Sequence, residues 1–387
     1  MRRRRTNLAF LLSLTACQTA TESSPRAEPS FIEVSLGTSQ ATGTLEEPMA
    51  FSSEEQMVAL SIETLDKSGD LIAFNGALQI DVRPGSLTGS PYVTVTDGAW
   101  SGNVGIKNGF GPTRVWFTEN AALGSENEAT YATGVSDPLY FEIPTIGEMN
   151  RTDDHETNQL EKEFAEIRAS DRDIRVTTVG TDGFWATDML DDAGEHNSLF
   201  IYTFSKPDEH VEVGRRLSLL TGNNQEYLAT TQLSFPTLLV TDEPAIEMPA
   251  PSELTADFCG ATDTLEGYES ALVTIKDVQI PDGFGTDLSD EDYADYIAYG
   301  QWPVVHTTGG CTWYISSAVP CPNFSPSDGL ALSEVTGMLS EVWDKWILNI
   351  RSPDDLPAGV CGGTEGPQPI GPARPLPREA PTSWNRK

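Results

Sequence analysis

The chain has 387 residues, of which 58 are acidic and 24 are basic, so its formal net charge is −34 at pH 7. The acids are scattered along the chain rather than gathered in one block, which predicts a solvated acidic surface. Such a surface repels polyphosphates and anionic headgroups, so we expect no nucleic-acid partner.

The N-terminus carries an export signal. Four arginines precede an apolar run over residues 8–14, and the segment ends in Leu14-Thr15-Ala16-Cys17. A basic region, a short apolar region and small residues before a cleavage site are typical of a secretory signal. The apolar run is too short to span a bilayer. We therefore predict a signal peptide over residues 1–16.

The last four of these residues resemble the lipobox of bacterial lipoproteins. The resemblance implies that Cys17 carries acyl chains such as palmitate, so that the membrane is a partner through the N-terminal lipid. Gln18 follows, which in that family implies sorting to the outer membrane. The alternative is an ordinary secretory signal with a chance cysteine. The polar residues 17–30 are expected to form a tether.

Four further cysteines, Cys259, Cys311, Cys321 and Cys361, lie in the last third of the chain. An even number of cysteines in an exported protein favours disulfides over metal ligation, and the chain has no CxxC motif. These cysteines predict a separate C-terminal unit. Three pairings are open, and we expect Cys311–Cys321 to close a short loop while Cys259–Cys361 joins the ends of the unit.

Residues 31–146 show the alternation of β-strands. In "MVALSIETLD" (57–66), Val58, Leu60 and Ile62 fall on one face. Further strand patterns such as "PTRVWFTE" and "DPLYFEIP" are separated by turn residues, which predicts an antiparallel β-sandwich. The stretch "LDKSGDLIAFNGALQIDVRPG" also resembles bacterial immunoglobulin-like domains, although the antibody-type cysteine pair is absent. The polar, acidic residues 147–158 are expected to be a linker.

Residues 159–248 carry about five strand patterns with glycine-marked bends, which suit a small barrel. "GFWATD", "SLFIYTF", "VEVGRRLSLLTG" and "QEYLATTQL" resemble, in the same order, the OB-fold modules appended to bacterial extracellular nucleases. The acidic stretch 188–195 and the scarcity of basic residues depart from that family.

Residues 249–361 resemble the second OB-like module of the same proteins. The similarity rests on "LEGYESALVTIKDVQI" (265–280), "CTWYISS" (311–317) and "LSEVTGMLSEVWDKWILNIRSPDDL" (332–356). The expected fold is therefore all-β: an immunoglobulin-like β-sandwich followed by two OB-like β-barrels. The proline-rich tail, residues 362–387, is expected to be disordered.

The motifs of common enzyme classes are absent: the chain has no GxSxG, no HExxH and no P-loop. The nuclease relatives carry a separate catalytic domain, and no segment here resembles it. We therefore expect no enzymatic activity, no cofactor and no metal. The four histidines, which fall in apparent loops or linkers, are expected to be structural: His155, His196, His210 and His306.

Two acidic stretches invite a calcium site, residues 188–195 and residues 287–295. For the second, a short helix capped by Ser289 and Asp292 is the favoured interpretation, with Tyr293, Tyr296 and Ile297 on one face. For the first, a plain hairpin loop is favoured. The sequence leaves calcium binding open at both.

A few residues mark a candidate binding surface on the first barrel: Arg215, Arg216, Trp185 and Tyr227. Aromatic side chains and basic side chains together are what an OB surface uses to hold single strands. Lys345 and Arg351 could form a second, smaller basic strip. Because their neighbours are acidic, most of the aromatic candidates are expected to be core residues; besides Trp185 and Tyr227 these are Phe200, Tyr202, Trp313, Trp343 and Trp346.

Taken together, these features favour a non-enzymatic outer-membrane lipoprotein that acts as a binding or scaffold module for other envelope proteins. The alternative is an accessory protein that binds nucleic acid or glycan.

Overall fold

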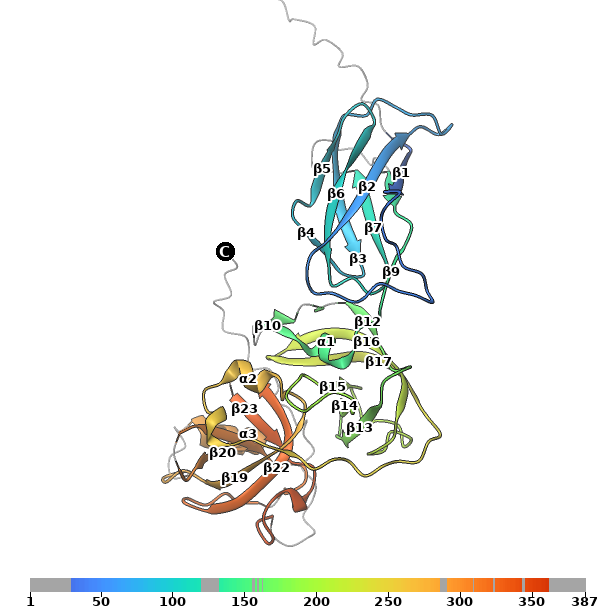
Figure 1. The fold of residues 1–387 in the computed structure, drawn as a ribbon. Helices are drawn as coiled ribbons and strands as arrows, with labels where there is room; N and C mark the ends of the chain where they lie inside the picture. The colour runs from blue at the N-terminus through green and yellow to red at the C-terminus, as the bar shows by residue number, and fades with distance from the viewer. Residues whose placement is uncertain are drawn as a thin grey trace, which may run out of the picture.

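The computed structural model describes residues 29–119, 132–154, 157–158, 160–161, 163–285, 291–308, 310–322, 324–342 and 345–361. The signal peptide, Cys17, all but the last two residues of the tether and the proline-rich tail lie outside these ranges. The described residues form three β-rich units, so the all-β expectation is confirmed. Figure 1 shows the first unit at one end of the molecule and the other two side by side at the opposite end.

The first unit has two facing sheets. One is ordered β1-β2-β6-β4 and the other β5-β3-β7-β8, with β9 also paired to β7. Val58, Leu60 and Ile62 of β2 are buried between the sheets, as their alternation predicts. The strands are β1 (Phe31–Leu36), β2 (Gln56–Leu65), β3 (Gly76–Arg83), β4 (Ser86–Thr88), β5 (Tyr92–Val95), β6 (Ala99–Lys107), β7 (Gly111–Glu119), β8 (Thr133–Val135) and β9 (Leu139–Phe141).

In the segment expected to be a linker, the described residues 147–154 and 157–158 are instead structured. It contains most of α1 (Ile146–Asn150) and the short strands β10 (Thr152–Asp154) and β11 (Thr157–Asn158). Thr145 and Glu148 form a capping box at the start of α1. Ile146 and Met149 are buried in the core of the second unit. These two side chains lie one helical turn apart. The polar composition of the segment gave no indication that they would be buried.

The second unit is built on one six-stranded sheet and is here called the first barrel, after the fold proposed below. Its sheet is ordered β12-β16-β17-β15-β14-β13, with β15 and β17 parallel. An isolated antiparallel bridge joins Arg175 of β13 to Arg216, the residue before β16, and so connects the two sides of the sheet. The strands are β12 (Phe164–Ile167), β13 (Ile174–Val179), β14 (Gly183–Asp188), β15 (Ser198–Tyr202), β16 (Leu217–Tyr227) and β17 (Thr230–Val240).

In the third unit, the second barrel, strands β19 to β23 repeat the order of strands β13 to β17, while the sixth strand, β18, joins the opposite end of the sheet from β12. Its sheet runs β18-β19-β20-β21-β23-β22, and the pairing of β19 with β22 closes five of these strands into a barrel. Trp302 and Trp313 fill its core. The elements are β18 (Ser252–Glu253), η2 (Ala256–Phe258), α2 (Thr262–Glu266), β19 (Leu272–Gln279), α3 (Glu291–Tyr299), β20 (Gln301–His306), β21 (Thr312–Ser316), β22 (Ala331–Val342), β23 (Lys345–Asn349) and η3 (Pro353–Asp355).

Both disulfides lie in the second barrel, but the expected pairing is wrong. The bonds join Cys259 to Cys311 and Cys321 to Cys361, with Cα–Cα distances of 5.0 and 5.1 Å. Cys311 precedes strand β21 and Cys321 follows it. A strand rises about 3.3 Å per residue, so β21 holds these two cysteines apart and no short loop can join them. Each therefore bonds to a segment at its own end of the strand.

Candidate binding surface

One row of side chains crosses the outer face of the first barrel. Thr178 lies opposite Trp185, Trp185 opposite Phe200, and Phe200 opposite Gln232. Residues that lie opposite each other on neighbouring strands share a face of the sheet. The alternate residues, such as Phe184 and Leu199, point into the barrel core. The row therefore faces outward.

The second barrel covers part of this outer face. The Thr178 hydroxyl donates to the sulfur of Met338 on β22 at 3.2 Å, and the Thr230 hydroxyl donates to the Glu341 carbonyl oxygen at 2.5 Å. Phe200, which lies on the same face, is only 1% exposed although it is outside the barrel core. Met338 is likewise fully buried but belongs to no barrel core. The two barrels thus bury each other's side chains at this junction.

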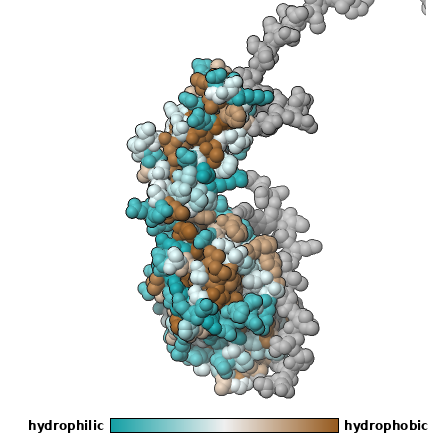
Figure 2. Space-filling model, turned by 90° about the vertical axis from the view of Figure 1, so that its right-hand side faces the viewer, coloured by the Kyte–Doolittle hydropathy of each residue, from teal (hydrophilic) through white to brown (hydrophobic). Residues whose placement is uncertain are grey.

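The aromatic side chains continue from the junction to the solvent. Ring centroids lie 4.6 Å apart for Trp185 and Phe200, 6.3 Å for Phe200 and Tyr202, 4.4 Å for Tyr202 and Phe204, and 4.7 Å for Phe204 and Phe235. We call these five residues the aromatic row. Its outer members, Phe204 and Phe235, are 52% and 66% exposed. Figure 2 shows that hydrophobic residues also gather on the side of the molecule that it presents, between hydrophilic margins.

The backbone at both exposed phenylalanines is in the left-handed region, with φ of 62° at Phe204 and 52° at Phe235. This conformation is rare for bulky residues and costs of order 1–3 kcal/mol. Two strained residues that hold two large apolar rings together in solvent are hard to explain by stability alone. Strain of this kind clusters at functional sites.

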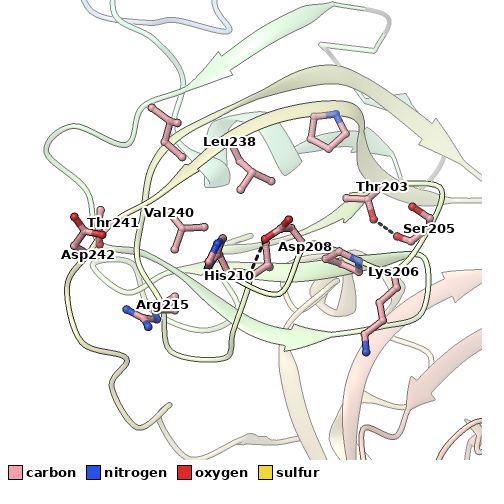
Figure 3. A pocket seen from close by; sticks show the side chains of 14 residues that line it. Thr203, Ser205, Lys206, Asp208, His210, Arg215, Leu238, Val240, Thr241 and Asp242 are labelled. Atoms are coloured by element: carbon pink, nitrogen blue, oxygen red, sulfur yellow. Dashed lines mark hydrogen bonds between the residues drawn. The ribbon is translucent and has the colours of Figure 1, made fainter.

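A groove of about 680 Å³ lies beside the exposed end of the aromatic row (Figure 3). Thr203 and Ser205, on either side of Phe204 in the chain, line it, as does Pro236, the neighbour of Phe235. The remaining lining residues are Lys206, Pro207, Asp208, His210, Val211, Arg215, Leu238, Leu239, Val240, Thr241 and Asp242. The groove thus combines an apolar wall from β17 with polar groups of both charges.

Ion pairs already engage the arginines expected to form a basic strip. Arg215 pairs with Glu212 at 3.3 Å and donates to the Glu243 carbonyl oxygen at 2.9 Å. Arg216 pairs with the Glu243 carboxylate at 2.9 Å. Tyr227 ends β16, whereas the arginines precede its start, so the strand separates them by about 30 Å. Of the four predicted surface residues, only Trp185 belongs to the aromatic row.

The second pair of candidate basic residues, Lys345 and Arg351, is also engaged in ion pairs. Lys345 pairs with Asp295 at 3.0 Å and with Asp292 at 3.3 Å, and Arg351 pairs with Asp355. The tryptophan candidates of the second barrel, Trp313 and Trp346, are core residues, as expected, and Trp343 lies outside the described residues.

The acidic stretch 188–195 is organised by an arginine. Arg172 contacts both Asp188, at 2.6 Å, and Asp191. The side chain of Asp188 is fully buried. The cation that lies between Asp188 and Asp191, where the sequence left a calcium site open, is therefore the guanidinium of Arg172.

The described part of the second acidic stretch, residues 291–295, forms the start of α3, as the helix interpretation predicts. Tyr293 and Tyr296 pack on Phe284, but Ile297 is 64% exposed, so its assignment to the same face is wrong. Ser289, the expected cap, lies outside the described residues.

The histidines occupy different environments. His210 lines the groove, His196 lies in the loop after β14, and His306 belongs to strand β20 rather than to a loop. Burial, followed by the charge of Arg151, lowers the pKa of His196. His155 lies outside the described residues.

The spacing of the aromatic residues in the sequence already indicated the aromatic row, although the prediction treated most of them as core residues. In "SLFIYTF", Phe200, Tyr202 and Phe204 occupy alternate positions, so they share one face of an extended strand. Phe235 had no such signal, because its contact with Phe204 depends on how strand β17 packs against the segment that follows β15.

Within the described ranges, no three histidine, cysteine, aspartate or glutamate side chains gather in a way that could hold a metal ion. No helix in the described part of the chain is long and apolar enough to cross a membrane. Comparisons with models of protein families, with curated proteins and with solved structures found no match to this chain.

Proposed function

We propose that the protein is a non-enzymatic binding module of the bacterial cell envelope, built from an immunoglobulin-like sandwich and two OB-like barrels. The strand connections support this fold. In both barrels the first three strands form a meander, the third strand pairs in parallel with the fifth, and the fourth pairs with the fifth and the first. This is the order expected of a five-stranded Greek-key barrel.

The exposed end of the aromatic row carries the functional proposal. Phe204 and Phe235 present two contacting rings next to a groove with polar groups, which is the composition of a protein-binding hot spot with its polar rim. The partner we propose is another envelope protein. The lipobox-like residues that end in Cys17 support attachment to the outer membrane through an N-terminal lipid.

The second candidate function is glycan binding, because aromatic rings beside polar side chains also suit sugar rings. Nucleic acid is the weaker variant of this alternative. The chain has a formal net charge of −34, and two of the basic residues near the aromatic row, Arg215 and Arg216, are in ion pairs.

A photo-crosslinking experiment tests the proposal. A benzophenone analogue of phenylalanine at position 235 keeps a large aromatic side chain at the exposed end of the row. The matched control places the same analogue at position 297, because Ile297 is 64% exposed, close to the 66% of Phe235, but lies on α3 of the other barrel. After irradiation of cells, we expect a discrete protein adduct from position 235 and none from position 297.

Equal adducts from both positions would contradict the proposed surface, because the analogue would then report only nonspecific proximity. An adduct of position 235 that is resistant to protease and sensitive to glycosidases would favour the glycan alternative.

A further inference from the structure

Strand β17 runs past the end of its neighbour β15. The last pair between the two strands joins Tyr202 to Ser234, whereas β17 continues to Val240. Beyond Tyr202 the chain turns towards the start of β14, because the Thr203 amide donates to the Asp182 carbonyl oxygen at 2.9 Å. Among the described residues, the end of β17 therefore pairs with β16 on one side and with no strand on the other.

Alternate residues of this end of β17 turn their backbone groups away from β16. The Thr241 amide donates to the carbonyl oxygen of the residue before β16 at 2.9 Å, and the Leu239 carbonyl oxygen accepts from a serine hydroxyl of β16 at 3.3 Å. Because backbone groups alternate in direction along a strand, the N–H and C=O groups of Leu238 and Val240 point to the opposite edge. No hydrogen bond in the described part of the chain engages them there. Pro236, which has no N–H group, occupies the preceding outward position, as proline does on edge strands.

This open edge, residues 236–240, forms one wall of the groove of about 680 Å³. The segment after β15 forms the other wall, and its residues Asp208 and His210 lie near Val240 (Figure 3). The two left-handed residues, Phe204 and Phe235, stand where β15 and β17 part. The strained backbone at these two positions thus separates the strands and gives access to the edge.

The second barrel has no such edge. Its fifth strand, β23, ends at Asn349, which pairs with Ser316 at the end of the third strand, β21. The chain then enters η3. The open edge is therefore an addition to the first barrel rather than a requirement of the shared strand order. Unpaired edges promote aggregation, so proteins blunt or cover them, and those that stay open commonly bind an extended chain.

The chemistry of the open edge matches a peptide. Donors and acceptors that alternate along a strand are complementary to the backbone of another extended chain. Phe235 and Leu239, on the outer face beside the edge, are 66% and 57% exposed. Leu238 and Val240 on the opposite face pack against the core of the first barrel. An added strand would thus find apolar side chains on either face.

The charges along the groove define the partner further. Arg215 lines the groove but is paired with Glu212. The two wall segments, residues 203–212 and 236–243, contain one lysine, Lys206, against several acids: Asp208, Glu209, Glu212, Asp242 and Glu243. An acidic groove on an acidic protein favours basic side chains in its partner.

We propose that the open edge binds a basic, extended peptide segment of the partner protein, which adds as a strand beside β17 in the place that β15 leaves. The Leu238 and Val240 amides donate to the peptide, and their carbonyl oxygens accept from it. At about 3.3 Å per residue, the edge has room for about five peptide residues. Strand addition rests on the proposed binding function and names what that function recognises.

Amide exchange of the full-length protein, resolved by NMR, tests the open edge. In the free protein we expect the Leu238 and Val240 amides to exchange faster than those of Thr237 and Leu239, which face β16. The probe is a blocked peptide of alternating lysine and valine. At about 1 mM it should slow exchange at Leu238 and Val240 at least twofold, which is the effect of half-occupancy at a dissociation constant of about 1 mM.

Two N-methylated versions of this peptide identify main-chain pairing. In an extended peptide the lysine amides lie along one edge and the valine amides along the other, so only one set can donate to β17. We expect methylation of one set to abolish the protection and methylation of the other set to leave it. Equal effects of the two versions would overturn the proposal. Slow exchange at Leu238 and Val240 in the free protein, or no protection by the unmodified peptide, would also overturn it.

A variant separates strand addition from the proposed function in cells. Leu238→Pro removes an outward donor and no bond to β16, and Leu238→Val is the matched control that keeps the amide. With the benzophenone at position 235, we expect Leu238→Pro to reduce the protein adduct about tenfold and Leu238→Val to keep it. If Leu238→Pro fails to fold, Val240→Pro removes the second outward donor instead.

An adduct that survives the proline variant would leave the proposed binding function standing and overturn strand addition. If the parent protein forms no adduct, the proposed function is contradicted, and the peptide titration still decides whether the edge accepts a strand.

Discussion

The two barrels have the same strand order but protect their outer faces in different ways. Phe200 of the first barrel and Tyr314 of the second occupy matching places, each on the third strand at its parallel pairing with the fifth. Phe200 is buried at the junction with the second barrel. Tyr314 lies beneath the Lys345 amino group, 4.6 Å from its ring centroid, and Lys345 is held by Asp292 and Asp295 of α3.

This difference shows that a barrel can cover its outer face by two routes. The second barrel uses a helix from its own chain segment, joined by opposite charges, so its cover is part of its fold. The first barrel uses a neighbouring unit, whose Met338 and Glu341 accept hydrogen bonds from Thr178 and Thr230 of the first barrel.

The disulfides should give the largest contrast between the barrels, because both lie in the second one. Each bond joins residues 52 or 40 positions apart. In the chain-entropy model, loops of this length are worth about 4 kcal/mol each. Replacing Cys321 and Cys361 together with alanine should lower the free energy of unfolding of the second barrel by about this amount.

Hydrogen exchange by mass spectrometry, read on peptides from each barrel, distinguishes the two units. We expect faster exchange throughout the second barrel, while the core strands of the first keep their protection. Uniform loosening of both barrels would show that they fold as one unit. Peptide mapping without reduction checks the pairing independently, and a Cys259–Cys361 peptide would contradict it.

The helix cover of the second barrel should depend on Lys345. The Asp295 side chain is 11% exposed, so Lys345→Met leaves a mostly buried carboxylate without its cation. We expect a loss of about 2 kcal/mol in the free energy of unfolding of the second barrel, measured by urea titration. Lys276→Met is the matched control, because that lysine forms an exposed pair with Glu253 and should change little. Similar losses in both variants would mean that α3 is not held by buried charge.

Features that depend on local pattern were predictable from the sequence. The alternation in β2, the helix at α3 and the alternating aromatic residues of β15 all follow from residue spacing. The disulfide pairing was not, because nearness in sequence favoured Cys311–Cys321 while strand β21 separates them. The junction between the barrels was also hidden: Thr178 and Met338 are distant in sequence, and only the docking of the two barrels brings them together.

The smallest expected effect on stability concerns the exposed end of the aromatic row. Phe235→Asn removes a bulky residue from a left-handed backbone that asparagine tolerates well, which relieves strain of order 1 kcal/mol. The same change removes the ring contact with Phe204, worth about 0.5–1.5 kcal/mol. These terms have opposite signs, so we expect the free energy of unfolding of the first barrel, measured by urea titration, to stay within about 1 kcal/mol of the wild type. Loss of an aromatic hot spot typically weakens binding by about 2 kcal/mol, so the protein adduct formed from a benzophenone at position 204 should fall about tenfold or more. Phe235→Tyr keeps the ring and should keep the adduct. If Phe235→Asn lowered stability strongly while the adduct persisted, Phe235 would be a packing residue rather than a binding residue.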